Sequence, residues 1–161
     1  MRVTKISLIL FLIVNAAHAS SSIYGSEFDY KKATPTSKYF SGKTRAQVAS
    51  YCKGEMLGTM DLSACAQFRY ESAIAALNKR ITEVVKILKV DDKENSAYGQ
   101  PAALPYFEKA QASWEQYRDN NCYFDTYSVG QASLHFVYFW DCMTRITNNR
   151  LTELTKPDND E

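Results

Sequence analysis

Four cysteines constrain this chain more than any other feature of its sequence, because all of them follow an apolar N-terminal run. They are Cys52, Cys65, Cys122 and Cys142. An even number of cysteines in an exported chain is typical of disulfides. Four cysteines allow three pairings, and their spacing favours Cys52–Cys65 together with Cys122–Cys142. A zinc site is the alternative, but C-x-x-C spacing is missing and the only histidine beyond residue 19 is His135. We therefore expect no metal ion and no other cofactor.

Residues 1–19 have the pattern of a signal peptide. Arg2 and Lys5 form a basic start, residues 6–14 form a nearly continuous apolar run, and Ala17-His18-Ala19 supplies the small residues that a signal peptidase reads. We expect cleavage after Ala19. The run is shorter than the roughly 18–20 residues of a membrane span. No later segment is long and apolar enough, and no lipobox cysteine follows the run. The sequence thus predicts a periplasmic or secreted protein without a membrane span after signal cleavage.

The charge of the remaining chain is balanced. The sequence has 19 basic and 18 acidic side chains, and removal of Arg2 and Lys5 leaves 17 basic ones, a net charge near −1. Nucleic-acid binding requires a strongly basic face, so we exclude it. The 142 residues that remain when 19 of the 161 are removed suit one domain with one core. We divide them into a flexible leader (20–43), a helical domain (44–155) and an acidic tail (156–161).

Apolar side chains recur every three or four positions between residues 62 and 90, which indicates one long amphipathic helix. Asp61 is its candidate N-cap. Tyr70 and Leu77 lie on the apolar stripe and are predicted core residues. The acidic cluster from residue 91 to 96 lacks the spacing of a calcium-binding loop, so a solvated turn is expected there.

Two further helices are expected after this turn. The first covers about residues 103–121, and its periodicity places Phe107, Trp114 and Tyr117 in the core. An aromatic loop at 123–132 then leads to a helix from about Ser133 to Leu154. We therefore predict an all-α fold, a small antiparallel helical bundle of three main helices that is stapled by two disulfides.

Arg118 and Asp119 form the most distinctive polar pair of the chain, since they adjoin the predicted apolar face of the second helix. Arginine among aromatic residues is typical of interface hot spots. The same pair can instead bridge helices and anchor the following loop, and we favour this role. Nearby aromatic residues crowd one region, and one helix face cannot bury them all. Those left outside are the candidate partner contact: Tyr123, Phe124 and Tyr127. The alternative is that these residues form part of a thick local core.

Catalysis has little support in the sequence. His135 has no serine or cysteine signature beside it, and the cysteines are assigned to disulfides. Asp119, Asp125 and Asp141 could pair as acid and base, but their spacing singles out no pair. We expect that the protein is not an enzyme.

Three motifs occur in order along the helices. The first is Cys65-Ala66-x-x-x-Tyr70-x-x-Ala73-x-x-x-Leu77-Asn78. The second is Ala110-Gln111-x-x-Trp114-x-x-Tyr117-Arg118-Asp119-x-x-Cys122, and the third leads from Gly130-x-x-Ser133 to Cys142-x-Thr144-Arg145-x-Thr147-x-x-Arg150. Together they resemble the LprI-like lysozyme-inhibitor family, long catalogued as a domain of unknown function. The resemblance covers about Cys52 to Leu154.

This resemblance implies an exported helical domain with two intramolecular disulfides, in a family of which at least one member is reported to inhibit lysozyme. The chain departs from that member because it lacks a lipobox cysteine, so surface anchoring does not carry over. We therefore predict an exported binding protein that inhibits lysozyme or a related cell-wall-cleaving glycosidase. Its partner is then a protein, with lysozyme as the first candidate. The alternative is a periplasmic interaction or immunity-type module that binds another exported protein and does not inhibit lysozyme.

Overall fold

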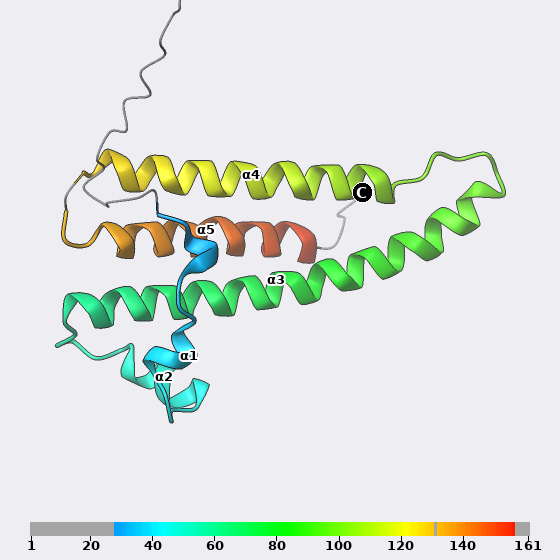
Figure 1. Cartoon of the computed structure of the whole chain (residues 1–161). Helices are drawn as coiled ribbons and strands as arrows, with labels where there is room; N and C mark the ends of the chain where they lie inside the picture. Colours follow the sequence, from blue (N-terminus) through cyan, green and yellow to red (C-terminus); the bar gives the residue numbers. More distant parts are fainter. Residues whose placement is uncertain (1–27, 131, 157–161) are drawn as a thin grey trace, which may run out of the picture. The chain divides into compact units, whose positions relative to one another are not determined.

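The computed structural model describes residues 28–130 and 132–156, and all regular structure in these two ranges is helical (Figure 1). The prediction of an all-helical protein with two disulfides is confirmed. The elements are η1 (Tyr30–Lys32), α1 (Thr36–Tyr39), α2 (Arg45–Tyr51), α3 (Thr59–Ser96), α4 (Leu104–Ser128) and α5 (His135–Thr155).

Residues 28–33, with the single turn η1, belong to a unit of their own, and the unit that begins at Thr34 contains all five α-helices. The expected signal peptide and most of the expected acidic tail lie outside the described residues. Among the helices within 28–130 and 132–156, none combines the length and the hydropathy that a membrane crossing requires.

Helix α5 packs along both α3 and α4, whereas α3 and α4 make few contacts with each other. The chain runs in one direction along α3, returns along α4 and reverses again along α5 (Figure 1). Two contacts fix the register of α5 on α3. Arg69 pairs with Asp141 at 3.0 Å, and Nε of Arg80 donates to the carbonyl oxygen of Leu154 at 2.8 Å. Helices α3 and α5 therefore run parallel to each other.

Helix α3 continues through the acidic cluster that was expected to form a turn. The helix continues to Ser96 because residues 91–96 contain no glycine or proline, and the lysine and glutamate among them favour helix. The carboxylate of Asp92 accepts hydrogen bonds from the backbone N–H groups of Ala103 (2.7 Å) and Leu104 (2.9 Å). The start of a helix leaves N–H groups unpaired and attracts negative charge. Asp92 thus caps α4 from the end of α3.

The core lies between α3 and α5. Tyr70 and Leu77 of α3 are buried, and Tyr70 stacks on Trp140 with ring centroids 5.4 Å apart. Phe139 is fully buried, and its ring packs edge-to-face with that of Trp140, with the two ring centroids 5.1 Å apart. Met143 and Ile146 continue this stripe along α5 at helical spacing. The motif-bearing helices are therefore held together by aromatic packing.

The buried face of α4 differs from the predicted one. Tyr117 is 60% exposed, so its placement in the core was wrong, and Phe107 and Trp114 are only partly buried. The buried residues of α4 follow one line at spacings of seven, four and four: Gln111, Arg118, Cys122 and Thr126. Tyr117 lies about 100° around the helix from this line. The apolar periodicity of the sequence predicted the wrong buried face of α4, because a core position of this helix is occupied by Arg118.

We expect Tyr117→Ala to change the free energy of unfolding by less than about 0.5 kcal/mol, as is usual at exposed positions. Urea denaturation followed by circular dichroism measures this value. Phe139→Ala is the comparison, since removal of a buried phenylalanine costs about 3–5 kcal/mol. Equal losses for the two variants would contradict the burial pattern described above.

Helices α1 and α2 pack against the start of α3. Thr36 donates from its backbone N–H (3.0 Å) and from its hydroxyl group to the carboxylate of Glu71. A small core joins Phe40 and Val48 to the first turns of α3. The Cys52–Cys65 disulfide closes this end, with Cα atoms 5.5 Å apart. The packed unit therefore includes residues ahead of the predicted boundary at residue 44.

Candidate functional site

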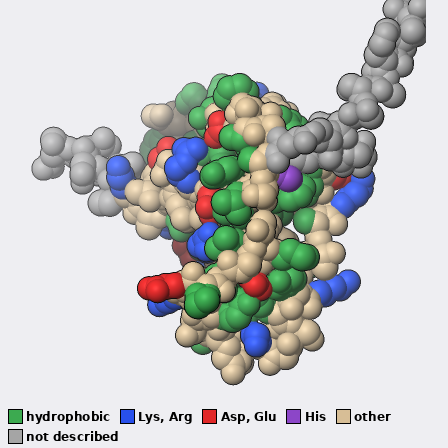
Figure 2. All heavy atoms as spheres, turned by 90° about the vertical axis from the view of Figure 1, so that its left-hand side faces the viewer, with side chains coloured by type: hydrophobic (Ala, Val, Ile, Leu, Met, Phe, Trp, Pro, Cys, Tyr) green, Lys and Arg blue, Asp and Glu red, His purple; other side chains and the backbone are tan. Residues whose placement is uncertain are grey.

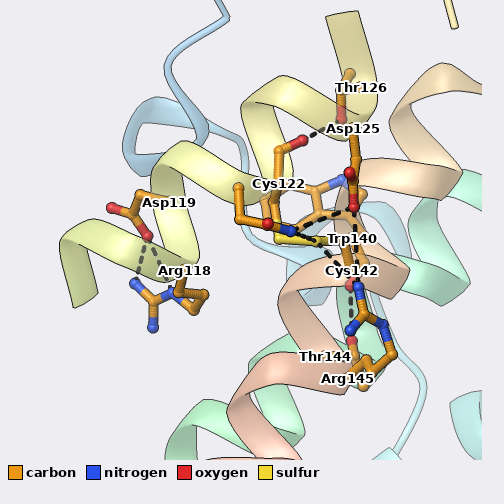
Figure 3. The surroundings of a disulfide bond; sticks show 10 residues. Arg118, Asp119, Cys122, Asp125, Thr126, Trp140, Cys142, Thr144 and Arg145 are labelled. Carbon is orange, nitrogen blue, oxygen red and sulfur yellow. Dashed lines mark hydrogen bonds and ion pairs between the residues drawn. A yellow bond between two sulfur atoms is a disulfide. The ribbon is translucent and has the colours of Figure 1, made fainter. Parts of the chain in front are cut away.

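The region selected from the sequence surrounds the Cys122–Cys142 disulfide, which joins α4 to α5 (Figure 3). The two Cα atoms are 5.6 Å apart, and both cysteines are buried. The side-chain nitrogens of Asn121 and Arg145 lie 3.7 and 3.8 Å from Sγ of Cys142. Figure 3 shows Arg118 and Arg145 on opposite sides of the bond. Both disulfides are those that the cysteine spacing favours, and no cysteine is left free.

Arg118 lies in the interior of the bundle one turn before Cys122, and only 4% of its side chain is exposed. Its Nε and Nη2 atoms donate to Oδ1 of Asp119 at 2.9 and 2.7 Å. The guanidinium carbon is 4.9 Å from the ring centre of Trp114 and 5.8 Å from that of Tyr70 on α3. A buried charge requires such partners, since loss of hydration costs several kcal/mol. These contacts connect α4 to α3, and burial leaves Arg118 no surface for a partner.

The aromatic loop predicted at 123–132 is wrong for its first six residues, because α4 continues to Ser128. No glycine or proline interrupts the helix after Cys122, and a cysteine in a disulfide is compatible with helical backbone. The hydroxyl of Thr126 donates to the carbonyl oxygen of Cys122 at 2.7 Å within this last part of α4. Gly130 then adopts φ +62°, which suits glycine, and the chain leaves the helix there.

The three aromatic residues proposed as a partner contact face different ways. The Tyr123 ring packs toward the bundle, with its centroid 5.2 Å from that of Phe139 and 5.8 Å from that of Tyr127. Phe124 is 69% exposed and Tyr127 is 37% exposed. Of the residues selected from the sequence for this region, Phe124 and Tyr127 are therefore the ones that a partner can reach.

A shallow hollow of about 640 Å³ opens beside the disulfide, between α4 and α5. Arg145 lies at its wall 3.8 Å from Asp125, and their side chains are 60% and 40% exposed. Exposed ion pairs of this kind contribute roughly 0–1 kcal/mol, so a partner's charge can replace one of them at little cost. No spacing signal in the sequence marked this hollow.

His135 places Nδ1 2.6 Å from the carbonyl oxygen of Ala132 at the start of α5, and all cysteines are oxidised. In the described ranges, no group of three His, Cys, Asp or Glu side chains could hold a metal ion. Gln111, a residue of the second motif, accepts from Nε of Arg150 at 3.1 Å and links α4 to the end of α5.

Comparison with known proteins gives two matches. The family model described as lysozyme inhibitor LprI matches residues 52–154, from the first cysteine to the last turn of α5. An uncharacterized protein of Rhizobium meliloti (strain 1021) is 34% identical over 99 residues, which are 59% of this chain and 70% of the relative. No solved structure matches the chain.

Proposed function

The chain belongs to the LprI lysozyme inhibitor family, and from this premise we propose that it is an exported protein that binds and inhibits lysozyme or a related cell-wall-cleaving glycosidase. The observation that carries the proposal is the extent of the family match, which includes both disulfides and all of α3 and α4. In this proposal the three long helices act as a small antiparallel bundle that presents a rigid surface.

The two disulfides support the proposal that the protein is located in an oxidising compartment. Such bonds persist in the periplasm and outside the cell and are rare in the cytosol. The cell wall and the enzymes that cleave it occupy the same space. A signal peptide at 1–19, cleaved after Ala19, would deliver the protein there, in agreement with the pattern of the sequence.

A protein without catalytic groups can inhibit lysozyme by occupying its cleft. Lysozymes cleave the glycosidic bond with two carboxyl groups on either side of the substrate. An inhibitor can cover this cleft or place a lysine or arginine against the two acids. A scaffold fixed by disulfides loses little conformational entropy on binding, which favours affinity. The helices and disulfides described above meet this requirement.

The experiment that tests the proposal adds the purified, oxidised protein to lysozyme that is digesting cell walls. We expect the rate of digestion to fall as the molar ratio of protein to enzyme rises. The reduced and alkylated protein is the control, and it should inhibit less because its scaffold is loosened. An unchanged rate at large molar excess, across several classes of lysozyme, would contradict the proposal. Tight co-purification with a different exported protein would then support the alternative module.

A further inference from the structure

The start of α3 carries an exposed apolar surface that lies outside the candidate site. The loop between α2 and α3 covers residues 52–58, and Met56 within it is 98% exposed. Met60 in the first turn of α3 is 74% exposed, and Tyr39 and Tyr51 are 46% and 39% exposed. We call these four residues the Met56 surface. Single exposed apolar residues are ordinary, but a group around one loop is typical of interaction sites.

The loop that carries Met56 is fixed at both ends. The Cys52–Cys65 disulfide ties its start to α3, and the backbone N–H of Gly54 donates to the carbonyl oxygen of Tyr51 at 3.0 Å. Leu57, next to Met56, packs against the small core that contains Phe40 and Val48. Leu57 therefore anchors the loop while Met56 points into solvent. A partner would meet a surface that is already ordered, which reduces the entropy cost of binding.

Asp61 joins the two tyrosines of the Met56 surface to α3. Its Oδ1 accepts hydrogen bonds from the hydroxyl groups of Tyr51 (2.7 Å) and Tyr39 (3.0 Å). These two bonds lower the pKa of Asp61, and the bond to Asp61 in turn raises the pKa of each tyrosine. At neutral pH the carboxylate is therefore charged and both phenols are protonated. Rings from α1 and α2 are held in place beside Met60.

Cations outnumber acidic residues in the segment that carries this surface. Residues 34–61 contain four cations, Lys38, Lys43, Arg45 and Lys53, and two acidic residues, Glu55 and Asp61. The four cations and Glu55 are exposed and Asp61 is partly buried, whereas the chain as a whole has a net charge of only +1. Figure 2 shows the end of the molecule where α3 begins, with hydrophobic side chains at the surface and both basic and acidic side chains in its lower half. The surface therefore suits an acidic partner.

We propose that the Met56 surface is the part of the protein that enters the substrate cleft of the inhibited glycosidase. This inference rests on the proposed function. A convex loop fits a concave cleft, and exposed cations complement a cleft whose catalytic groups are carboxylates. Methionine adapts its shape and packs well against aromatic rings. Met56 contacts the wall of the cleft, and the ammonium group of Lys53 at the start of the loop faces the acids.

The inference is tested by inhibition assays on four variants, with the unmodified protein as reference. Met56→Asp and Lys53→Glu should each raise the concentration needed for half-inhibition about tenfold or more, as is typical when an interface anchor is lost. Met56→Leu keeps an apolar side chain and should stay within about threefold, since volume-conserving apolar replacements are tolerated. Tyr98→Asp alters an exposed aromatic residue just after the end of α3 and should leave inhibition unchanged. All three positions are exposed, so thermal unfolding should remain that of the reference protein.

The outcomes separate this inference from the proposed function. If the reference protein inhibits and Met56→Asp and Lys53→Glu inhibit equally well, the inference is overturned and the function stands. A loss confined to Tyr98→Asp would move the contact to the segment after α3 and would also overturn it. A reference protein that does not inhibit any lysozyme would remove the proposed function and the inference together.

Discussion

Replacement of Arg118 by alanine should lower the free energy of unfolding by about 3–5 kcal/mol, the cost of removing one partner of a buried ion pair. The side chain is 4% exposed, and its loss would leave the Asp119 carboxylate, itself only 18% exposed, without the guanidinium. It would also remove the cation from between Trp114 and Tyr70. Urea denaturation followed by circular dichroism measures the change.

Arg69→Ala is the matched control for this experiment. Arg69 and Asp141 are 3.0 Å apart, similar to the 2.7 Å between Arg118 and Asp119, but their side chains are 45% and 48% exposed. Water screens this pair, so its loss should cost less than about 1 kcal/mol. The two arginines therefore differ mainly in burial. Similar losses for both variants would show that burial does not strengthen the Arg118 pair.

The double replacement Cys122→Ala and Cys142→Ala should cost about 3 kcal/mol, because the disulfide restricts a loop of 20 residues in the unfolded chain. Alanine is preferred to serine, since a hydroxyl group at these buried positions would lack a partner. Denaturation under non-reducing conditions gives the value. Addition of a reductant should lower the stability of the unmodified protein but have less effect on this variant, which keeps only Cys52–Cys65. A variant as stable as the unmodified protein would show that packing alone holds α4 against α5.

Much of the fold could be predicted because cysteine pairing and apolar periodicity are local signals. Tyr70 and Leu77 were placed in the core correctly, since α3 presents one regular stripe to α5. The face of α4 could not be predicted in the same way. Its core position is held by Arg118, whose burial depends on rings from two helices and on Asp119. Hydropathy assigns arginine to water, so only the tertiary contacts reveal this position.

The candidate site was interpreted in part as a loop, although its first six residues after Cys122 are helical. Tyr123, Phe124 and Tyr127 lie on the last turns of α4, where they diverge between the bundle and solvent. We predicted a loop because this segment is rich in aromatic residues, and the segment is helical. The Met56 surface was missed for a different reason. It combines α1, α2 and the start of α3, and no single segment of the sequence shows that Tyr39 and Tyr51 both reach Asp61.

The most direct test is a calorimetric titration of the purified, oxidised protein into lysozyme, alone and with a saturating oligosaccharide in the cleft. We expect a one-to-one complex whose apparent affinity falls when the oligosaccharide is present, because both ligands occupy the same cleft. Binding that the oligosaccharide does not weaken would contradict occupation of the cleft. No binding to any class of lysozyme would contradict the account as a whole.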